Sequence, residues 1–295
     1  ENAIFIVYGL KQSDNTIKQV KDLCANFSAL IRSMRNRFPE MQFSCTIGFG
    51  ADAWKQLFPE QGNPKELKTF ETIKGAKYTA VSTPGDILLH IRAKQMGLCF
   101  EFASIIDEKL KGVVDSIDET HGFRYMDGKA IIGFVDGTEN PAVDENPYHF
   151  AVIGDEDPDF IGGSYVFVQK YIHDMTAWNS LPVEAQEKVI GRHKYNDVEL
   201  SDEEKPQNAH NAVTNIGDDL KIVRANMPFA NTSKGEYGTY FIGYASTFST
   251  TRRMLENMFI GSPAGNTDRL LDFSTAITGT LFFVPSYDLL GELGE

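Results

Sequence analysis

Apolar residues at strand and helix spacing dominate the start of the chain. The run AIFIVYGL, residues 3–10, is apolar almost throughout and predicts a buried strand. Asn15 follows, a residue type that caps helices, and apolar side chains then recur at three- and four-residue spacing. This spacing predicts one buried helix face made of Ile17, Val20, Leu23, Phe27, Leu30, Ile31 and Met34.

The pattern then changes between strand and helix several times up to residue 125. In QFSCTIGF, residues 42–49, apolar side chains alternate with others as in a half-buried strand. The later predicted elements are a short helix at 51–60, a strand at 85–93, a long helix at 95–110 and a strand at 113–125. The main order β-α-β-β-α-β is typical of the split ferredoxin-like arrangement, an antiparallel sheet with helices on one face.

The second half repeats this organisation less regularly. Strands are predicted at 163–172, 221–229, 238–246 and 279–287, and helices at 182–191 and 250–261. The strand-to-helix passages CTIGFGADAWKQLF and YFIGYASTFSTTRRML are similar in character and indicate a faint internal duplication. We therefore expect an α+β fold of two ferredoxin-like domains, residues 1–127 and 128–295, each an antiparallel β-sheet with flanking helices. Two long polar insertions, near 142–162 and 191–218, are of the length that often carries function.

Composition and charge limit the possible partners. The formal net charge of −13 disfavours nucleic acid and anionic membranes, which attract basic surfaces. No apolar run reaches bilayer-spanning length, and the opening residues lack the features of a signal peptide. The three cysteines, Cys24, Cys45 and Cys99, are far apart in sequence and are expected to be buried and reduced. These features favour a cytoplasmic protein without a membrane partner.

In the stretch GFVDGTENP, residues 133–141, an apolar run is followed directly by an Asp-Gly pair. A strand that ends in a turn explains it, because Asp-Gly and Asn-Pro are common turn pairs. The alternative is that Asp136 is a carboxylate at the rim of an apolar pocket, available for proton transfer. The nine residues alone leave both interpretations open. Dinucleotide, P-loop, nucleophile-elbow and HExxH motifs are absent from the sequence.

Three more polar residues stand out in the second half. His210 lies in EKPQNAHNAVTNIG, a polar stretch before a predicted strand where an imidazole can face a cavity. Arg224 lies inside the apolar strand KIVRANMPF, and a buried guanidinium requires a counter-charge or a polar pocket. Asn226, two residues further on, shares its face of that strand.

These motifs together resemble the dye-decolorising peroxidase family of haem peroxidases, in its bacterial B-type branch. The resemblance rests on HGFRY, GFVDGTENP, GGSYVFVQ, VIGRHK, LKIVRANMPF and ITGTLFFVPSYD, which stand in family order over nearly the whole chain. It implies haem b in the C-terminal domain, hydrogen peroxide as oxidant, and dyes, phenolics or other small organic one-electron donors. It also suggests a dimer or a higher homo-oligomer.

The resemblance also implies roles for individual residues. His210 would be the proximal ligand of the haem iron, with His193 the next candidate, and Asp136 the distal acid–base residue. Arg224 would be the distal arginine and Asn226 would order distal water. Asp288 would accept a hydrogen bond from the second nitrogen of the proximal histidine. The further implied haem contacts are Gly137, Thr138, Asn140 and Phe241.

Two other functions remain open at this point. A haem-handling protein, which carries haem or releases its iron, would use the same histidine, although it has no need for an Asp/Arg pair. A cofactor-free interaction module would bind no haem. Electron relay to the surface is assigned to no single residue. The candidate relay residues are Tyr125, Tyr237, Tyr240, Tyr244, Trp54 and Trp178.

Overall fold

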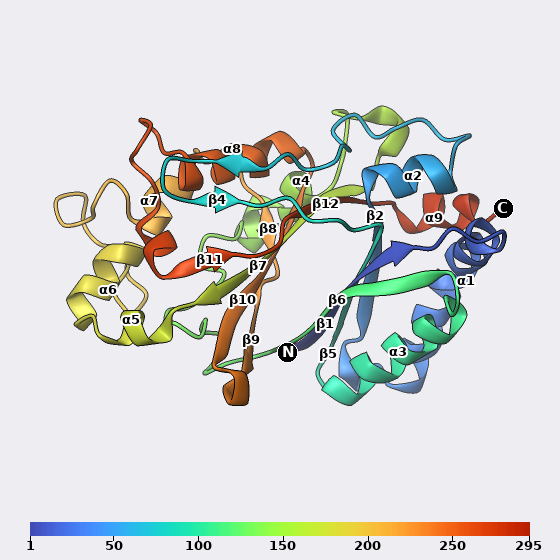
Figure 1. Ribbon diagram of the computed structural model, residues 1–295, viewed down its shortest axis with the longest axis horizontal. Coiled ribbons are helices and arrows are strands. Elements are labelled where there is room, and N and C mark those ends of the chain that lie inside the picture. The colour runs from blue at the N-terminus through green and yellow to red at the C-terminus, as the bar shows by residue number, and fades with distance from the viewer.

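The computed structural model describes all residues, 1–295. It has one extended sheet with helices on its outer sides, and residues 73–74 and 79–80 form a separate two-stranded sheet (Figure 1). The strands are β1 (Asn2–Leu10), β2 (Ser44–Phe49), β3 (Ile73–Lys74), β4 (Thr79–Ala80), β5 (Ile87–Ala93), β6 (Val114–Phe123), β7 (Ser164–His173), β8 (Val223–Arg224), β9 (Met227–Asn231), β10 (Glu236–Ala245), β11 (Ser274–Ala276) and β12 (Thr280–Val284). The α-helices are α1 (Thr16–Arg37), α2 (Ala51–Leu57), α3 (Met96–Lys109), α4 (Pro147–Ala151), α5 (Met175–Asn179), α6 (Val183–Ile190), α7 (His210–Thr214), α8 (Phe248–Phe259) and α9 (Tyr287–Leu293).

The first half forms the expected split β-α-β-β-α-β sheet. Its strands lie in the order β6-β1-β5-β2 and all pairs are antiparallel. Helix α1 buries most of its predicted stripe, including Val20, Phe27 and Met34, in the largest core cluster. Ile17 is an exception, since its side chain is 42% exposed. The prediction of a buried position there was wrong, and the neighbouring Thr16 is the buried residue of the first turn.

The second half repeats the same strand order. Its strands lie in the order β12-β7-β10-β8, with α5 to α7 inserted after β7 and α8 after β10. The ferredoxin-like fold is therefore confirmed for both halves, and the faint internal similarity corresponds to a repeated topology. Strand β12 also pairs with β2, where Phe283 lies opposite Phe49, so the two half-sheets form one ten-stranded sheet.

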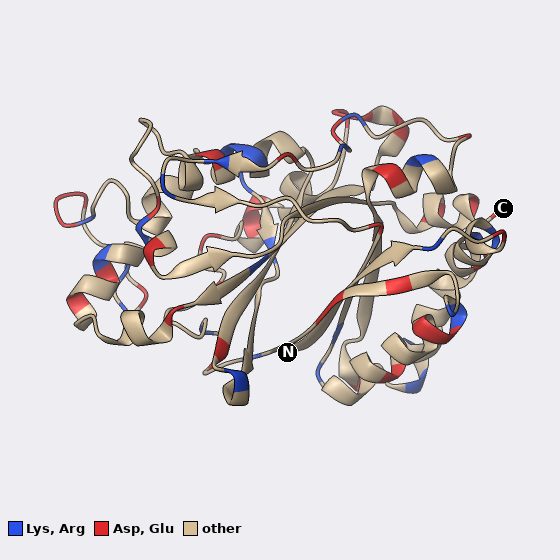
Figure 2. Cartoon of the chain, in the orientation of Figure 1, with Lys and Arg blue, Asp and Glu red and all other residues tan.

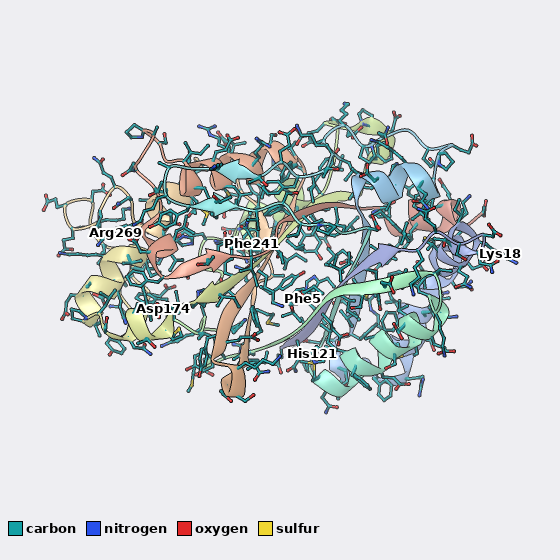
Figure 3. The ribbon with its side chains drawn as sticks, in the orientation of Figure 1. Phe5, Lys18, His121, Asp174, Phe241 and Arg269 are labelled. Carbon is teal, nitrogen blue, oxygen red and sulfur yellow. The ribbon has the colours of Figure 1, made fainter.

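A second apolar cluster connects the two halves of the sheet. It contains Phe5 of β1, Leu88 of β5, Val166 of β7 and Tyr240 of β10, with six further buried residues. The rings of Phe5 and Tyr240 stack with their centroids 4.0 Å apart, and Phe5 lies at the centre of the molecule (Figure 3). The halves are therefore held together by side-chain packing as well as by the β2–β12 pairing.

Three predicted elements differ from the structure. The apolar run before Asp136 forms turns and single bridges instead of a strand. The predicted strand 221–229 is interrupted between Arg224 and Met227 and forms β8 and β9. The predicted strand 279–287 ends at Val284, and the chain continues into α9, which packs on α1 of the first half. In each case tertiary contacts override local apolar character.

The three cysteines are buried and free, as expected. No helix is both long enough and apolar enough to cross a bilayer. The domain boundary between residues 127 and 128 falls in a tight turn after β6 and stays a prediction.

Truncation of Phe5 should test the packing between the halves. We expect Phe5→Ala to lower the free energy of unfolding by about 3–5 kcal/mol, because the change leaves a cavity in a fully buried aromatic stack. Chemical denaturation measures this loss. Phe100→Ala is the matched control, since the Phe100 side chain is 59% exposed. Equal effects of the two substitutions would contradict a role for Phe5 in joining the halves.

Candidate functional site

A large cavity in the second half collects most of the predicted site residues. Its empty volume is about 1020 Å³, part of which is open to solvent, and 13 of its 23 lining residues are hydrophobic. Strands β7, β8 and β10, helices α7 and α8 and the loop before Asp136 all contribute to its wall. Asp136, His210, Arg224, Asn226 and Phe241 all line it. The chain therefore brings together residues that are up to about a hundred positions apart in sequence.

The apolar run before Asp136 anchors the loop that carries this carboxylate. Ile132 and Phe134 are buried in a small cluster around Trp178, whose indole N–H donates to the Ile132 carbonyl at 2.9 Å. The Asp136 amide donates to the Gly128 carbonyl at 3.1 Å. Gly137 follows at φ +86°, a left-handed conformation that favours glycine. The run before Asp136 is not a strand, but the turn is present and is compatible with the pocket interpretation, because the Asp-Gly turn directs Asp136 to the cavity.

Asn140 connects this loop to the strand that carries Arg224. Its side-chain amide donates to the Arg224 carbonyl at 2.9 Å, and its side-chain oxygen accepts from the Arg224 amide at 2.8 Å. This pair of bonds replaces strand pairing on that side of β8. Asn140 lies outside the lining of the large cavity and borders a neighbouring one, so its visible contact is with the backbone of Arg224.

Asn226 occupies the break between β8 and β9. Its side-chain oxygen accepts from the Ile242 amide of β10 at 3.1 Å, which takes the place of a missing backbone acceptor. Its amide nitrogen lies 3.4 Å from one oxygen of Asp136, a long hydrogen bond. Asn226 thus fixes the distance between the Asp136 loop and the sheet.

Asp136 and Arg224 are both half-buried and have few polar partners in the protein. The second oxygen of Asp136 is buried without a hydrogen-bond partner. The Arg224 guanidinium takes part in no ion pair or side-chain hydrogen bond of the protein. Desolvation lowers the pKa of Arg224, although the nearby carboxylates of Asp136 and Glu139 act in the opposite direction. A buried carboxylate oxygen without a partner is expensive to maintain and points to a bound partner or a catalytic role.

His210 begins helix α7 and is held by a carboxylate that the sequence did not reveal. Its Nδ1 lies 2.6 Å from one oxygen of Asp268, and the Asp268 side chain is completely buried. The other Asp268 oxygen accepts from the Leu270 amide at 2.8 Å. Asp268 looks in sequence like an ordinary cap of a short turn, so no local signal marks it as a histidine partner.

The expectation that Asp288 accepts this bond is wrong. Asp288 is an exposed residue in the first turn of α9, the helix that packs on α1 in the first half. The motif VPSYD begins at the last residue of β12, and no residue of β12 or α9 lines the large cavity. Asp268 is the carboxylate beside His210 instead, because it lies in the segment that follows α8, the helix that contacts α7.

Two imidazoles line the cavity, and only one has a free nitrogen. His173 uses both ring nitrogens, with Nδ1 at 2.7 Å from the Ser274 hydroxyl and Nε2 at 2.9 Å from the Thr239 hydroxyl. His210 uses only Nδ1, so its Nε2 is available. His193, the other candidate, lies outside the cavity and pairs with Glu187 at 3.1 Å. The free ligand nitrogen in the cavity is therefore Nε2 of His210.

The remaining predicted contacts divide between cavity and surface. Phe241 of β10 lines the cavity, and Gly137 borders the neighbouring one with Asn140. Thr138 is exposed and donates to Asp197 at 2.6 Å, away from the cavity. Trp54 and Trp178 are fully buried, with indole N–H groups bonded to backbone carbonyls. Electron relay through any aromatic residue stays a prediction.

The side chains that line the large cavity fit a metal ion that is coordinated mainly by a cofactor and only once by the protein. No group of three or more His, Cys, Asp or Glu residues is arranged to hold a bare metal ion. A single free imidazole nitrogen, an apolar wall and a volume at the upper end of the roughly 300–1,000 Å³ range of cofactor sites match haem instead. The unpartnered Asp136 oxygen and Arg224 guanidinium supply polar groups for a small reactant beside it.

Comparison with known proteins identifies the same family for both halves of the chain. Residues 1–124 match the family described as Dyp-type peroxidase, N-terminal, and residues 127–289 match Dyp-type peroxidase, C-terminal. A dye-decolorizing peroxidase of Rhodococcus erythropolis is 50% identical, over 99% of this chain and 86% of its own length.

Solved structures agree with this result. The crystal structure of a dye-decolorizing peroxidase from Bacteroides thetaiotaomicron is 88% identical and covers 100% of this chain and 96% of its own, with a TM-score of 0.99. A variant of DypB from Rhodococcus jostii, solved in complex with heme, is 46% identical over 100% of this chain and 96% of its own, with a TM-score of 0.95.

The buried state of His173 should make stability depend on pH. Burial lowers the pKa of His173 to about 4, against a model-compound value of 6.5, so the unfolded chain binds the extra proton between these values. Stability is therefore lost as the pH falls from about 6.5 to about 4, by up to about 3 kcal/mol. We expect His173→Gln to flatten the pH dependence of the unfolding free energy in this window, as measured by denaturant titration. His121→Gln, at an exposed position, should retain the wild-type slope, and an unchanged slope in His173→Gln would contradict the assignment.

Proposed function

The chain belongs to the Dyp-type peroxidase family, and on that basis we propose that it binds haem b through His210 and uses hydrogen peroxide to oxidise small organic one-electron donors. The proposal includes Asp136 and Arg224 as the pair that acts on peroxide. It also includes Asn226 as the residue that positions Asp136. The homo-oligomer suggested by the resemblance remains part of the proposal.

One observation carries the ligand assignment. His210 is the cavity histidine whose Nε2 is free, while both nitrogens of His173 are engaged by hydroxyl groups. The bond from Nδ1 to Asp268 selects the tautomer in which Nε2 presents a lone pair. A buried carboxylate at this position also makes the imidazole more electron-rich, which favours oxidised forms of the metal.

When bound, haem supplies the iron that passes the oxidising equivalents of peroxide to the donors. The protein supplies the proton transfer and the charge stabilisation. The free oxygen of Asp136 accepts a proton from one peroxide oxygen and returns it to the other as the O–O bond breaks. The unpaired guanidinium of Arg224 stabilises the negative charge that develops on the departing oxygen.

Asn226 and Asn140 are positioning residues in this scheme. Asn226 contacts Asp136 directly, and Asn140 holds the backbone of Arg224 by two hydrogen bonds. Phe241 supplies an apolar surface for the cofactor, and Gly137 permits the turn that presents Asp136.

A haem-handling protein is the second candidate, and it is not favoured. It would use the same His210 ligand, yet it would gain nothing from an unsatisfied carboxylate and an unpaired arginine in one cavity. Such groups reduce stability, and proteins retain them where a reaction uses them.

Removal of the ligand should prevent haem binding. We expect His210→Ala to fold but to retain little haem, measured as the ratio of haem absorbance to protein absorbance after reconstitution. His193→Ala is the control, because His193 lies outside the cavity and should leave that ratio unchanged. Full haem occupancy in His210→Ala would show that another residue holds the iron.

Removal of the carboxylate should separate haem binding from chemistry. We expect Asp136→Asn to keep its haem and to react with peroxide at least about 100-fold more slowly, because proton transfer by a positioned group contributes roughly that factor or more. Rapid mixing with peroxide, followed by haem absorbance, measures the rate constant. Asp127→Asn removes the same charge from an exposed position nearby and should react normally. A wild-type rate in Asp136→Asn would exclude this carboxylate as the proton carrier.

A further inference from the structure

A second cavity adjoins the first on the side of Asp136. Its empty volume is about 620 Å³ including open solvent, and it shares Asp136, Arg224 and Asn226 with the large cavity. Its other walls include Met227 and Pro228 of β9 and four residues that follow β6, namely Arg124, Tyr125, Gly128 and Lys129. The three shared side chains therefore separate the two spaces and border both.

The lining of this second cavity is rich in unpaired positive charge. Arg124, Lys129 and Arg224 all line it, and none of them takes part in a salt bridge. Asp136 and Glu1 are the acidic residues of the lining. The chain has 41 Asp and Glu against 28 Lys and Arg, spread over both halves (Figure 2). This lining therefore carries three basic residues against two acidic ones, the reverse of the balance in the whole chain.

A tight turn brings these cations together. The amides of Gly128 and Lys129 both donate to the Tyr125 carbonyl, at 2.9 and 2.8 Å. Gly128 has φ +98°, and a side-chain carbon at this position would lie 3.6 Å from the Arg124 guanidinium. The Gly128 carbonyl accepts from the Asp136 amide. One turn thus places Arg124 and Lys129 beside the loop of the reactive carboxylate.

We propose that this second cavity binds a small anionic organic electron donor, of the phenolic carboxylate class, with its carboxylate toward Arg124 and Lys129. This inference rests on the proposed function, in which haem fills the large cavity and leaves this space next to Asp136. Hydrogen peroxide is uncharged at neutral pH and gains little from a cationic lining, whereas a carboxylate gains charge-assisted hydrogen bonds. The volume lies within the roughly 300–1,000 Å³ range of small-molecule sites, which suits a single substituted ring.

The reaction proposed for this site has the stoichiometry of a peroxidase, with two donor molecules for each peroxide. Each of two donor molecules gives up one electron and its phenolic proton, and becomes a phenoxyl radical. The two electrons and two protons reduce one peroxide to two water molecules as the O–O bond breaks. The carboxylate of the donor stays unchanged and serves only for binding.

The test compares an anionic donor with its neutral analogue. The probes are 4-hydroxy-3,5-dimethoxybenzoate and the corresponding carboxamide, and the variant of the haem-loaded protein is Arg124→Gln with Lys129→Gln. Calorimetry without peroxide should give a Kd for the benzoate about tenfold higher in this variant, the loss expected for about one charge-assisted hydrogen bond. Steady-state oxidation at saturating peroxide should show the same rise in KM for the benzoate at unchanged kcat. The KM for the carboxamide should stay as in the wild type.

The control removes two charges far from the cavity. Lys18→Gln with Lys109→Gln changes two exposed lysines without ion-pair partners, and Lys18 lies at the far end of the molecule (Figure 3). This control should bind the benzoate like the wild type. An unchanged Kd in the Arg124/Lys129 variant, or an equal loss for the benzoate and the carboxamide, would overturn the proposal. If the wild-type protein oxidised neither probe, the proposed function would be contradicted, while the calorimetric Kd values would still decide the site.

Discussion

The hydrogen bond between His210 and the buried carboxylate of Asp268 supports the rest of the site. It joins the polar segment before α7 to the turn after α8, and the backbone bond from Arg269 to Asn208 reinforces the same connection. These two segments form one side of the large cavity. A carboxylate that is completely buried is costly unless it is bonded, and the Asp268 oxygens have the His210 imidazole and the Leu270 amide as partners. The site therefore has a ligand whose orientation is fixed by the fold.

On the side of the large cavity that carries Asp136 and Arg224, fewer polar groups have hydrogen-bond partners in the protein. The apolar anchor around Trp178 and the Asn140 clamp hold the Asp136 loop and β8 in place by packing and by backbone bonds. They leave one oxygen of Asp136 and the guanidinium of Arg224 without protein partners. The protein thus maintains a polar pair at a cost in stability, which is the arrangement expected where these groups must act on a reactant.

The three residues that line both cavities face a different environment on each side. The large cavity is mostly apolar, and the second carries cations that the acidic chain leaves unpaired. Asp136, Arg224 and Asn226 lie between them, so a cofactor on one side and a small reactant on the other would meet at the same side chains. Strands β6 and β9, which are far apart in the strand order, contact each other in the fold, and residues beside both of them line the second cavity.

Much of this protein follows from the sequence itself. Apolar spacing located the main strands and the stripe of α1, because burial on one face imposes a period on the chain. The local motifs identified Asp136, Arg224, Asn226 and His210, which all line one cavity. Other features were decided only by tertiary structure. Asp268 instead of Asp288 meets His210 because the end of α8 returns to α7, a long-range contact without local signature. The apolar run before Asp136 became an anchor instead of a strand because Trp178, more than forty residues later, offers it a core. Periodicity records that a residue is buried, and only the folded chain determines which partner it is buried against.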